Sequence, residues 1–558
     1  METKISDKKV ILQSKDIPKN EPAQKSSKSL KDKIKEEIAD LKNYIQILKR
    51  GKLKLEPYSV EKFGDIVSYS VMNDYVEKFR YWVHEPFAFV SILHNEAKNE
   101  YQYFVVEPEL SLFERMVLET VYENILDTLT VYETSNVSKS EIIETKALEL
   151  MDSYSIDVDM KLIHKVLYYI KRDYIGYERL DILMKDTQIE DISCDGSDVP
   201  IFVYHRKYHN IKTNISFEGQ KLDSYVVKLA QRCGKQVSLG EPLLNSTLPD
   251  GSRLNATLGK EVTFRGSTFT IRKFREHAFT PVDLVKNKTY SIDILAYFWI
   301  AVENGKSIIF AGATAAGKTS SLNSISLFIP PVAKIVSIED THELMLHHTN
   351  WIGSVTRESF TKSSNVTDID MYELLRQALR QRPEYIIVGE IRGKEATTLF
   401  QAINTGHTTY STMHADSVET VISRLEGDPI NIPRVMIQSL DILSIQKMMV
   451  FGNKRVRRLD SLVEFIGIDP KTQDLRFNEL YSWDPRDDTF ISGGKSYVLE
   501  DIMATRNWDE EKLNQEMKNR KKVIEYMVEK DMDEYEVVAM IQSYYADAEK
   551  TMKFIART

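Results

Sequence analysis

One short run of residues has the types and spacing of a phosphate-binding loop. Residues 312–319 read Gly-Ala-Thr-Ala-Ala-Gly-Lys-Thr, which fits the pattern G-x-x-x-x-G-K-[ST]. Glycines let the backbone N–H groups turn inward around phosphate oxygens, a lysine reaches the β- and γ-phosphates, and a threonine hydroxyl suits Mg²⁺. The run therefore predicts a site for ATP and Mg²⁺, formed by Gly312, Ala313, Thr314, Ala315, Ala316, Gly317, Lys318, Thr319 and Ser320.

Acidic residues follow two other apolar segments of the same region. Glu339 and Glu343 come after the segment 334–338, and Glu390 comes after 385–388. The carboxyl ends of parallel strands meet at one edge of a sheet, so these groups are expected beside the loop. Hydrolysis requires a carboxylate that orients water and usually a second one near the metal. We expect Glu339 and Glu390, together with Thr319, to serve the metal directly or through water.

Histidines and arginines supply further candidates. His407 and His414 flank the segment 408–412; a lone histidine more often makes a structural hydrogen bond, and the alternative here is a contact that senses the γ-phosphate. No third ligand at suitable spacing supports zinc. Arg253 and Arg272 precede a linker, where they are either ordinary surface residues or contacts to a nucleotide phosphate at a domain boundary.

The elements that must position these residues are predicted from hydrophobic periodicity. We expect a flexible basic tail over 1–35, a mostly helical region over 36–175, a small α/β domain over 176–275 and a linker over 276–281. The predicted helices of the second region cover 34–48, 110–132, 138–151 and 156–174. In the third region, strands at 200–204 and 268–272 flank a helix at 222–232.

From residue 282 to about 470, strand-like and helical segments alternate. The predicted strands are 307–311, 334–338, 385–388 and 408–412. This order is typical of βαβ units, so the fold class is α/β with a twisted, mostly parallel sheet covered on both faces. The last 50 residues predict two charged amphipathic helices, the second with an apolar face that runs from Val537 to Ile555.

Composition limits the functions that the chain can have. Its 558 residues suggest two or three domains, and the formal net charge of −9 argues against a general nucleic-acid binder. Two cysteines without a C-x-x-C pair fit a reducing cytosol. The sequence has no apolar run of about 18 residues, so we expect any membrane role to be peripheral. Residues 1–35 contain ten lysines, and this tail either is only solvated or contacts anionic lipid or an acidic partner.

Together these motifs resemble the secretion ATPase superfamily of type II secretion and type IV pilus motors. The phosphate loop is followed by an acidic box at 337–343, a Val-Gly-Glu element at 387–393 and a histidine box at 405–414. The resemblance implies a ring-forming, RecA-like P-loop ATPase. It also implies that Glu343 activates water, that Glu390 lies near Mg²⁺ and that His407 and His414 belong to the histidine box. The arginines before the linker, Arg253 and Arg272, would contact nucleotide across the ring.

The resemblance further implies partners and a location. Members form homohexamers and drive a polytopic membrane platform protein, with other filament-motor accessory proteins, at the cytoplasmic face of the cell membrane. The Lys-rich N-terminal region and the Phe-Thr-Ile-Arg-Lys-Phe run at 269–274 resemble most closely the archaellum motor ATPase. Archaeal adhesion-pilus ATPases and type II secretion ATPases are the alternatives. A nucleic-acid motor and a non-hydrolysing ATP-sensing scaffold are two further hypotheses from other classes.

Overall fold

The computed structural model describes residues 55–129, 138–153, 159–274, 277–357, 368–452 and 454–557. It divides into two compact units. The first contains the described residues up to Asp186 together with Ile211–Ile215, and the second contains 187–210 and the residues from Ser216 onward. The predicted basic tail and the predicted helix 34–48 lie outside the described residues.

Three helices of the first unit correspond to predicted ones. They are α3 (Leu112–Leu129), α4 (Lys139–Ser153) and α5 (Met160–Tyr174). Helix α5 begins after Asp159, whose side chain accepts a hydrogen bond from the N–H of Leu162 and so caps the first turn. Apolar residues spaced along the three helices meet in one buried core, which includes Val121, Ala147 and Val166.

The first unit also contains strands that the sequence analysis did not predict. Strands β1 (Val76–His84), β2 (Ala88–Asn95) and β3 (Glu100–Val106) form an antiparallel meander. The central part of β6 (His209–Ser216) pairs in parallel with β3. These strands are rich in aromatic and β-branched residues, a composition that favours strands. They lie between the predicted helices 34–48 and 110–132, in a stretch of the region expected to be mostly helical for which no individual helix was predicted. Three short helices complete the unit: α2 (Val60–Phe63), η1 (Glu178–Leu180) and α6 (Asp181–Lys185).

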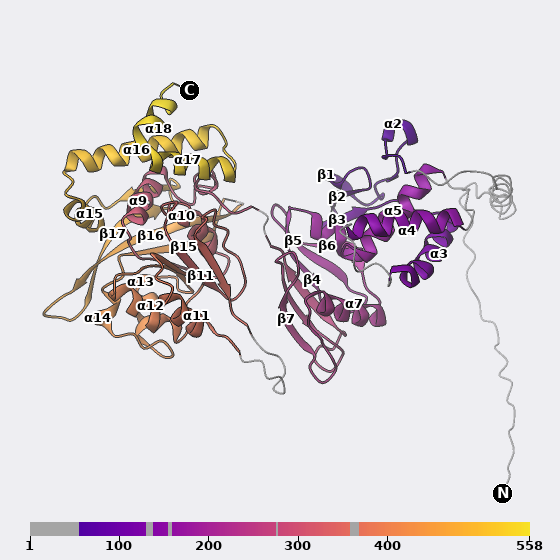
Figure 1. Ribbon diagram of the computed structural model, residues 1–558, viewed down its shortest axis with the longest axis horizontal. Coiled ribbons are helices and arrows are strands. Elements are labelled where there is room, and N and C mark those ends of the chain that lie inside the picture. The colour runs from indigo at the N-terminus through magenta and orange to yellow at the C-terminus, as the bar shows by residue number, and fades with distance from the viewer. Residues whose placement is uncertain are drawn as a thin grey trace, which may run out of the picture. The chain divides into compact units, whose positions relative to one another are not determined.

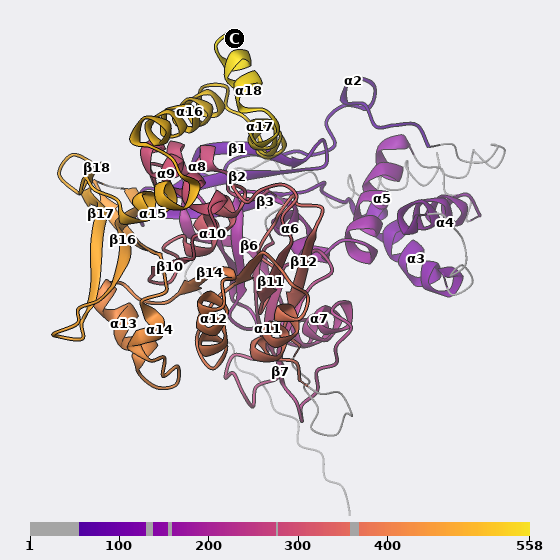
Figure 2. The ribbon, with the colours of Figure 1, turned by 60° about the vertical axis from the view of Figure 1, so that its left-hand side comes forward.

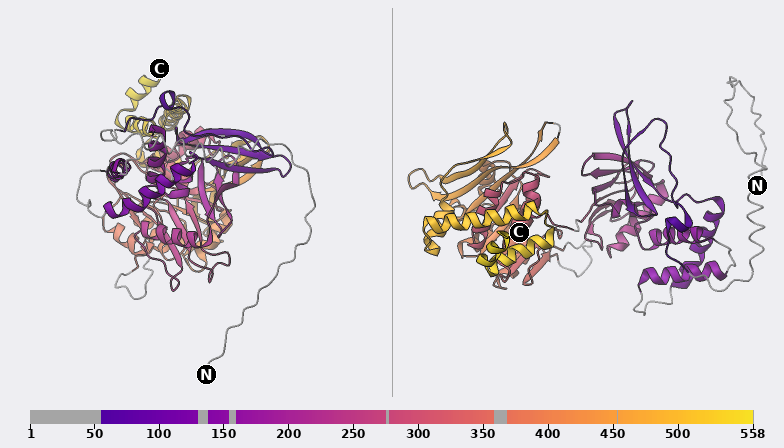
Figure 3. Two further views of the ribbon diagram at one scale, coloured as in Figure 1. Left: turned by 90° about the vertical axis from the view of Figure 1, so that its right-hand side faces the viewer. Right: turned by 90° about the horizontal axis from the view of Figure 1, so that it is seen from above.

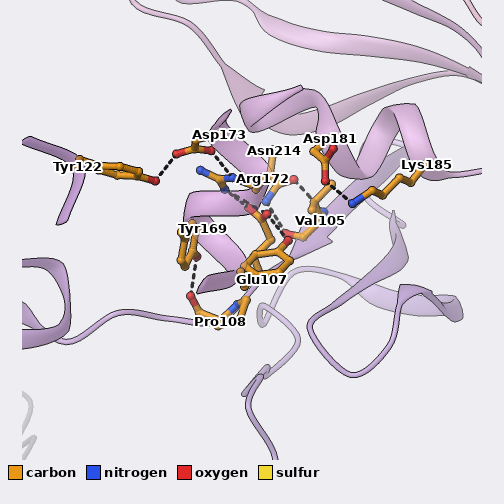
Figure 4. A network of polar contacts seen from close by, with 11 residues as sticks. Val105, Glu107, Pro108, Tyr122, Tyr169, Arg172, Asp173, Asp181, Lys185 and Asn214 are labelled. Atoms are coloured by element: carbon orange, nitrogen blue, oxygen red, sulfur yellow. Dashed lines mark hydrogen bonds and ion pairs between the residues drawn. The ribbon is translucent and has the colours of Figure 1, made fainter. Parts of the chain in front are cut away.

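A polar network connects strand β3 of this unit to its helices (Figure 4). Arg172 on α5 donates two hydrogen bonds to Glu107, the shorter at 2.9 Å, and one to Asp173 at 2.7 Å. Asp173 also accepts a 2.6 Å hydrogen bond from the Tyr122 hydroxyl on α3. The side chain of Asn214 bonds both backbone groups of Val105 at 2.9 Å. Each charged group therefore has a partner of opposite charge, which a half-buried network requires.

The small α/β domain of the second unit was predicted in outline. Strands β5 and β9 and helix α7 cover the predicted segments. The antiparallel neighbours run in the order β5-β4-β9-β8-β7. The elements are β4 (Ile189–Cys194), β5 (Pro200–His205), α7 (Gly219–Arg232), β7 (Leu243–Thr247), β8 (Arg253–Thr257) and β9 (Thr268–Arg272).

A nine-stranded sheet forms the centre of the region after the linker, with the order β12-β11-β13-β14-β10-β15-β16-β17-β18. The strands from β12 to β15 are parallel, and the last three pair antiparallel at one edge (Figure 2). The parallel strands are β10 (Ile308–Gly312), β11 (Ile335–Glu339), β12 (Trp351–Val355), β13 (Tyr385–Val388), β14 (Thr408–Met413) and β15 (Ile442–Phe451). The antiparallel strands are β16 (Lys454–Ile468), β17 (Leu475–Asp484) and β18 (Thr489–Ser492). The predicted RecA-like α/β sheet is confirmed.

Helices cover both faces of this sheet, as predicted (Figure 1). One face packs against α8 (Pro281–Lys286), α9 (Ile292–Glu303), α10 (Lys318–Ser326) and the C-terminal helices α15 (Tyr497–Arg506), α16 (Glu510–Glu529), α17 (Glu534–Ala546) and α18 (Ala548–Ile555). The other packs against α11 (Met371–Leu379), α12 (Glu395–Asn404), α13 (Val418–Glu426) and α14 (Arg434–Ile437).

The last predicted helix is divided into two. Asp547 has an extended backbone, with φ −159° and ψ 94°, and its side chain accepts a hydrogen bond from the N–H of Lys550. It therefore ends α17 and caps α18, the usual use of an aspartate at a helix start. In Figure 3 these C-terminal helices, in yellow, lie together on one side of the sheet. None of the helices in the described ranges is both long enough and apolar enough to cross a bilayer.

A buried arginine fastens the C-terminal helices to α9. Arg520 is 2% exposed; it pairs with Glu303 on α9 and donates to Glu516 at 2.5 Å. Replacement of Arg520 by Ala leaves both carboxylates without their buried partner, so we expect the free energy of unfolding to fall by about 3–5 kcal/mol. Urea denaturation of this variant measures the loss. The neighbouring Lys521 pairs with Asp293 on the surface, so Lys521→Ala should change stability by about 1 kcal/mol or less. Equal losses for the two variants would contradict the assignment.

Candidate nucleotide-binding site

The predicted phosphate loop connects β10 directly to helix α10. Gly312 ends the strand, and a side chain there would lie 2.4 Å from the backbone oxygen of Gln446. Gly317 has the left-handed conformation, φ 97°, and is the N-cap of α10, which begins at Lys318. The loop therefore leads to the N-terminus of α10, which packs against the sheet. At this end of the helix, unpaired N–H groups and the helix dipole favour a phosphate.

Lys318, His414 and Glu390 form a continuous set of contacts beside this loop. Lys318 is 7% exposed, and its Nζ donates to the carbonyl oxygen of Ala313 at 3.0 Å and to Nδ1 of His414 at 3.4 Å. The Nε2 atom of His414 lies 3.2 Å from the Glu390 carboxylate. A neutral ring with its proton on Nε2 satisfies both contacts. Burial and the charge of Lys318 lower the pKa of His414, which favours that neutral ring.

Burial also lowers the pKa of Lys318, because a desolvated ammonium group is less stable. The negative charge of Glu390 opposes this shift, whereas Arg392 and Arg272 add to it. Arg392 also pairs with Glu390 and lies 3.5 Å from the carboxylate of Asp340. The site thus places several positively charged side chains around the single carboxylate of Glu390. This excess of positive charge suits a ligand that carries several negative charges.

Glu339 and Glu343 of the acidic box have different surroundings. Glu339 ends β11 and is 3% exposed; one carboxylate oxygen accepts the N–H groups of Glu343 and Leu344, both at 2.9 Å. Its other oxygen lies 3.3 Å from Nδ1 of His342. Glu339 therefore holds the backbone of the acidic-box segment in place. The side chain of Glu343 is exposed to solvent.

The oxygen donors of this site suit Mg²⁺ that is shared with phosphates and water better than a metal ion that is held by protein side chains alone. Within the described ranges, no three His, Cys, Asp or Glu side chains gather closely enough to hold a metal ion. The Thr319 hydroxyl and the Glu390 carboxylate are hard oxygen donors, which suffice for Mg²⁺ when phosphates and water complete its shell. Glu339 stays a prediction as a ligand. Gly389 lies against it: a side chain there would approach the Glu339 Cγ to 3.3 Å.

The two histidines of the histidine box lie at opposite ends of β14. Met413 at the end of that strand pairs with Ala311, so His414 follows at the edge of the loop. His407 precedes the strand. The six residues of extended chain in β14 place it about 20 Å from His414. Its Nδ1 lies 3.3 Å from the Thr405 hydroxyl. The structure therefore brings His414, but not His407, to Lys318; the catalytic role of His407 stays a prediction.

Arg253 and Arg272 are cross-strand partners on β8 and β9. Like charges directly opposite on a sheet repel each other, and the carboxylate of Asp191, the partner of Arg272 on the neighbouring strand β4, offsets part of this repulsion. Arg253 is half-buried, and its Nε has no hydrogen-bond partner among the described residues. These features agree with the predicted phosphate contact and do not test it.

Two further residues contact the loop and were missed by the sequence analysis. Gln446 on β15 is fully buried and donates to the Ser321 hydroxyl of α10 and to Tyr290 at 2.8 Å. Arg457 on β16 donates from Nε to the carbonyl oxygen of Ala315 at 2.8 Å. Both lie more than 120 residues after the loop in the chain, and no motif marks them. The only available signal was a polar residue within an apolar strand, at Gln446.

A buried carboxylate at the start of α17 joins three separate segments. Glu534 is 6% exposed and lies 2.7 Å from Nε2 of His347, on the segment between the acidic box and β12. It also accepts the N–H of Ala278 in the linker at 3.2 Å, and the ring of His277 lies 3.5 Å away. The C-terminal helices, the acidic-box segment and the linker thus share one contact.

Comparison with protein families gives two matches. The model described as type II/IV secretion system protein matches residues 180–548, two thirds of the chain. The model for the N-terminal region of PilB3-like proteins matches residues 35–109. The first match contains all four motifs, the linker and the C-terminal helices α15–α17.

Individual relatives are similar over different lengths. An uncharacterised protein of Methanocaldococcus jannaschii is 34% identical over 532 residues, which cover 90% of this chain and 95% of that protein. The type IV secretion system protein PtlH of Bordetella pertussis is 31% identical over 37% of this chain and 66% of its own length. Among solved structures, the ATPase DotB of Legionella pneumophila is 20% identical, covers 50% of this chain and 79% of that one, and has a TM-score of 0.39.

Proposed function

Since the chain belongs to the family of type II/IV secretion system proteins, we propose that it is an ATP-hydrolysing motor of a type IV pilus-like filament. The observation that carries the proposal is the contact series Lys318–His414–Glu390 beside a glycine-rich loop. Each member comes from a different strand end of one parallel sheet, so the series depends on the whole fold. A loop that matched the motif by chance would not have these neighbours.

The residues of the site have distinct tasks in this proposal. The loop N–H groups and the first turn of α10 bind the phosphates, and Lys318 exchanges its contact with Ala313 for one with the β- and γ-phosphates. Thr319 and Glu390 would hold Mg²⁺, which would neutralise phosphate charge when bound together with ATP. Glu343 removes a proton from the attacking water. His414 reports the state of the γ-phosphate, because it contacts both Lys318 and Glu390.

Arg253 and Arg272 complete the proposed motor as contacts between subunits of a homohexamer. Two arginines opposite each other, at the start of β8 and the end of β9, offer planar sets of N–H donors from which phosphate oxygens can accept hydrogen bonds. Binding of ATP would draw this domain onto a nucleotide, and hydrolysis would release it. The force would pass to a polytopic membrane platform protein and its accessory proteins. We propose a cytoplasmic location at the membrane's inner face.

The filament we propose is the archaellum, on the resemblance of the N-terminal region and of residues 269–274. Archaeal adhesion-pilus assembly and a type II secretion-type role are the alternatives. The relative from Methanocaldococcus jannaschii, of which 95% is covered by the match, is uncharacterised. It therefore favours none of the three proposed roles.

Membrane vesicles and DNA should affect turnover differently. We expect vesicles of anionic or tetraether lipid to raise the ATPase rate of the full chain, because the lysines of residues 1–35 provide about 1 kcal/mol each near an anionic surface. Double-stranded and single-stranded DNA should leave the rate unchanged, as the net charge of −9 suggests. Release of phosphate from ATP is the measurement, with neutral vesicles as the control. Strong stimulation by DNA would replace the proposed function with a nucleic-acid motor.

A further inference from the structure

The hairpin of strands β15 and β16 extends past the end of β10. In the parallel pairing, Gly312 at the end of β10 lies opposite Gln446, and β15 continues for five more residues to Phe451. Each strand residue adds about 3.3 Å, so Met448 and its antiparallel partner Arg457 lie roughly 7 Å beyond Gly312. The hairpin therefore reaches over the phosphate loop, although its sequence lies far from the loop motifs.

Arg457 uses this position to contact the loop directly. Its Nε donates to the carbonyl oxygen of Ala315 at 2.8 Å. Its stem lies over Gly317, since a side chain added at that glycine would meet the Arg457 Cδ at 3.3 Å. The adjacent Arg458 points the other way and is buried in an ion pair with Asp488 at 2.7 Å. Within the described ranges the Arg457 side chain has no protein carboxylate as a partner, so its tie is to the loop backbone.

Ala315 has a conformation that requires such support. Its φ is +62°, in the left-handed region that residues with a Cβ rarely adopt. The carbonyl of Ala315 and the N–H of Ala316 belong to one planar peptide and point in opposite directions. With the carbonyl turned outward to Arg457, the N–H of Ala316 points into the loop, where it lies 3.2 Å from the Ala313 oxygen. The hydrogen bond to Arg457 thus fixes the orientation of this peptide, whose N–H group donates to the Ala313 oxygen within the loop.

We propose that Arg457 is a positioning residue of the phosphate loop, which holds Ala315 in its left-handed conformation and thereby sets the affinity for ATP. The inference rests on the proposed nucleotide site. A loop that is only fractionally in its binding conformation binds its ligand more weakly in the same proportion. Loss of Arg457 therefore affects binding and leaves the chemical step, carried by Glu343 and Glu390, unchanged once ATP is bound.

Titration with a fluorescent ATP analogue, alongside steady-state kinetics, tests this inference. In the full chain, Arg457→Gln should raise the Kd of the analogue and the KM for ATP about tenfold, while kcat at saturating ATP stays unchanged. Arg455 is the matched control: it has the same charge and lies two residues away on the same strand face, so Arg455→Gln should keep the wild-type Kd. Unaltered thermal unfolding of both variants shows that they fold.

A second variant separates the positioning role from a simple charge effect. Glycine adopts positive φ freely, so in an Ala315→Gly background the loop no longer needs Arg457, and Arg457→Gln should then change Kd less than twofold. The inference is overturned if Arg457→Gln binds as tightly as the wild type, if it lowers kcat alone, or if the tenfold loss persists in the glycine background. Wild-type protein that binds no ATP would instead overturn the proposed function.

Discussion

Replacement of Glu343 by Gln should abolish ATP turnover while ATP binding is retained. The amide keeps the size and the hydrogen-bonding capacity of the side chain but cannot accept a proton from water, so kcat should fall roughly a thousandfold. The backbone of the loop should stay in place, because it is held by Glu339 through the N–H groups of Glu343 and Leu344. Phosphate release and nucleotide titration, carried out on the same preparation, measure the two effects separately.

An exposed glutamate elsewhere in the same domain provides the control for this variant. Glu419 on α13 is exposed and contacts none of the site residues described above, so Glu419→Gln should turn over ATP at the wild-type rate. Wild-type turnover by Glu343→Gln would remove Glu343 from the role of base. Loss of binding together with turnover would show instead that the loop had rearranged.

Lys318→Ala should weaken both binding and catalysis, in contrast to Glu343→Gln. The ammonium group would make charge-assisted hydrogen bonds to phosphate, and the loss of about 2 kcal/mol corresponds to a Kd roughly thirtyfold higher. The same group stabilises charge that develops on the transferred phosphate, so kcat should fall by a further factor of roughly one hundred. The variant also removes the contact to Nδ1 of His414. Calorimetric titration with ADP and ATP measures the affinity change.

The lysine that directly follows the Val-Gly-Glu element is the matched control for Lys318. Lys394 is exposed at the start of α12, and Lys394→Ala should bind and hydrolyse ATP as the wild type does. If Lys318→Ala retained wild-type affinity, the phosphates would have to bind elsewhere, and the assignment of the loop would be wrong.

Local spacing predicted the parts of the fold that short-range patterns determine. Strands β9 and β13 have the predicted bounds, β10 and β11 are shifted by one residue at both ends, and β14 is one residue longer than predicted. The convergence of Lys318, Glu390 and His414 followed from a general property of parallel sheets. It required only that the three strands be recognised.

Features that depend on distant partners were not predictable from the sequence. Gln446 and Arg457 contact the loop because β15 pairs with β10, which no local pattern states. The distance of His407 from the loop follows from the direction of β14, although its motif suggested a common site with His414. Strands β1–β3 were missed because the pattern of the surrounding helices was extended across them.

The three contacts of Glu534 have a mechanical consequence for a motor. This single buried carboxylate touches the linker at Ala278 and the acidic-box segment at His347. A pull on the linker would therefore act on the segment that follows Glu343 through this one shared residue. Because Glu534 belongs to the C-terminal helices, residues near the end of the chain join the linker to the segment that follows the acidic box.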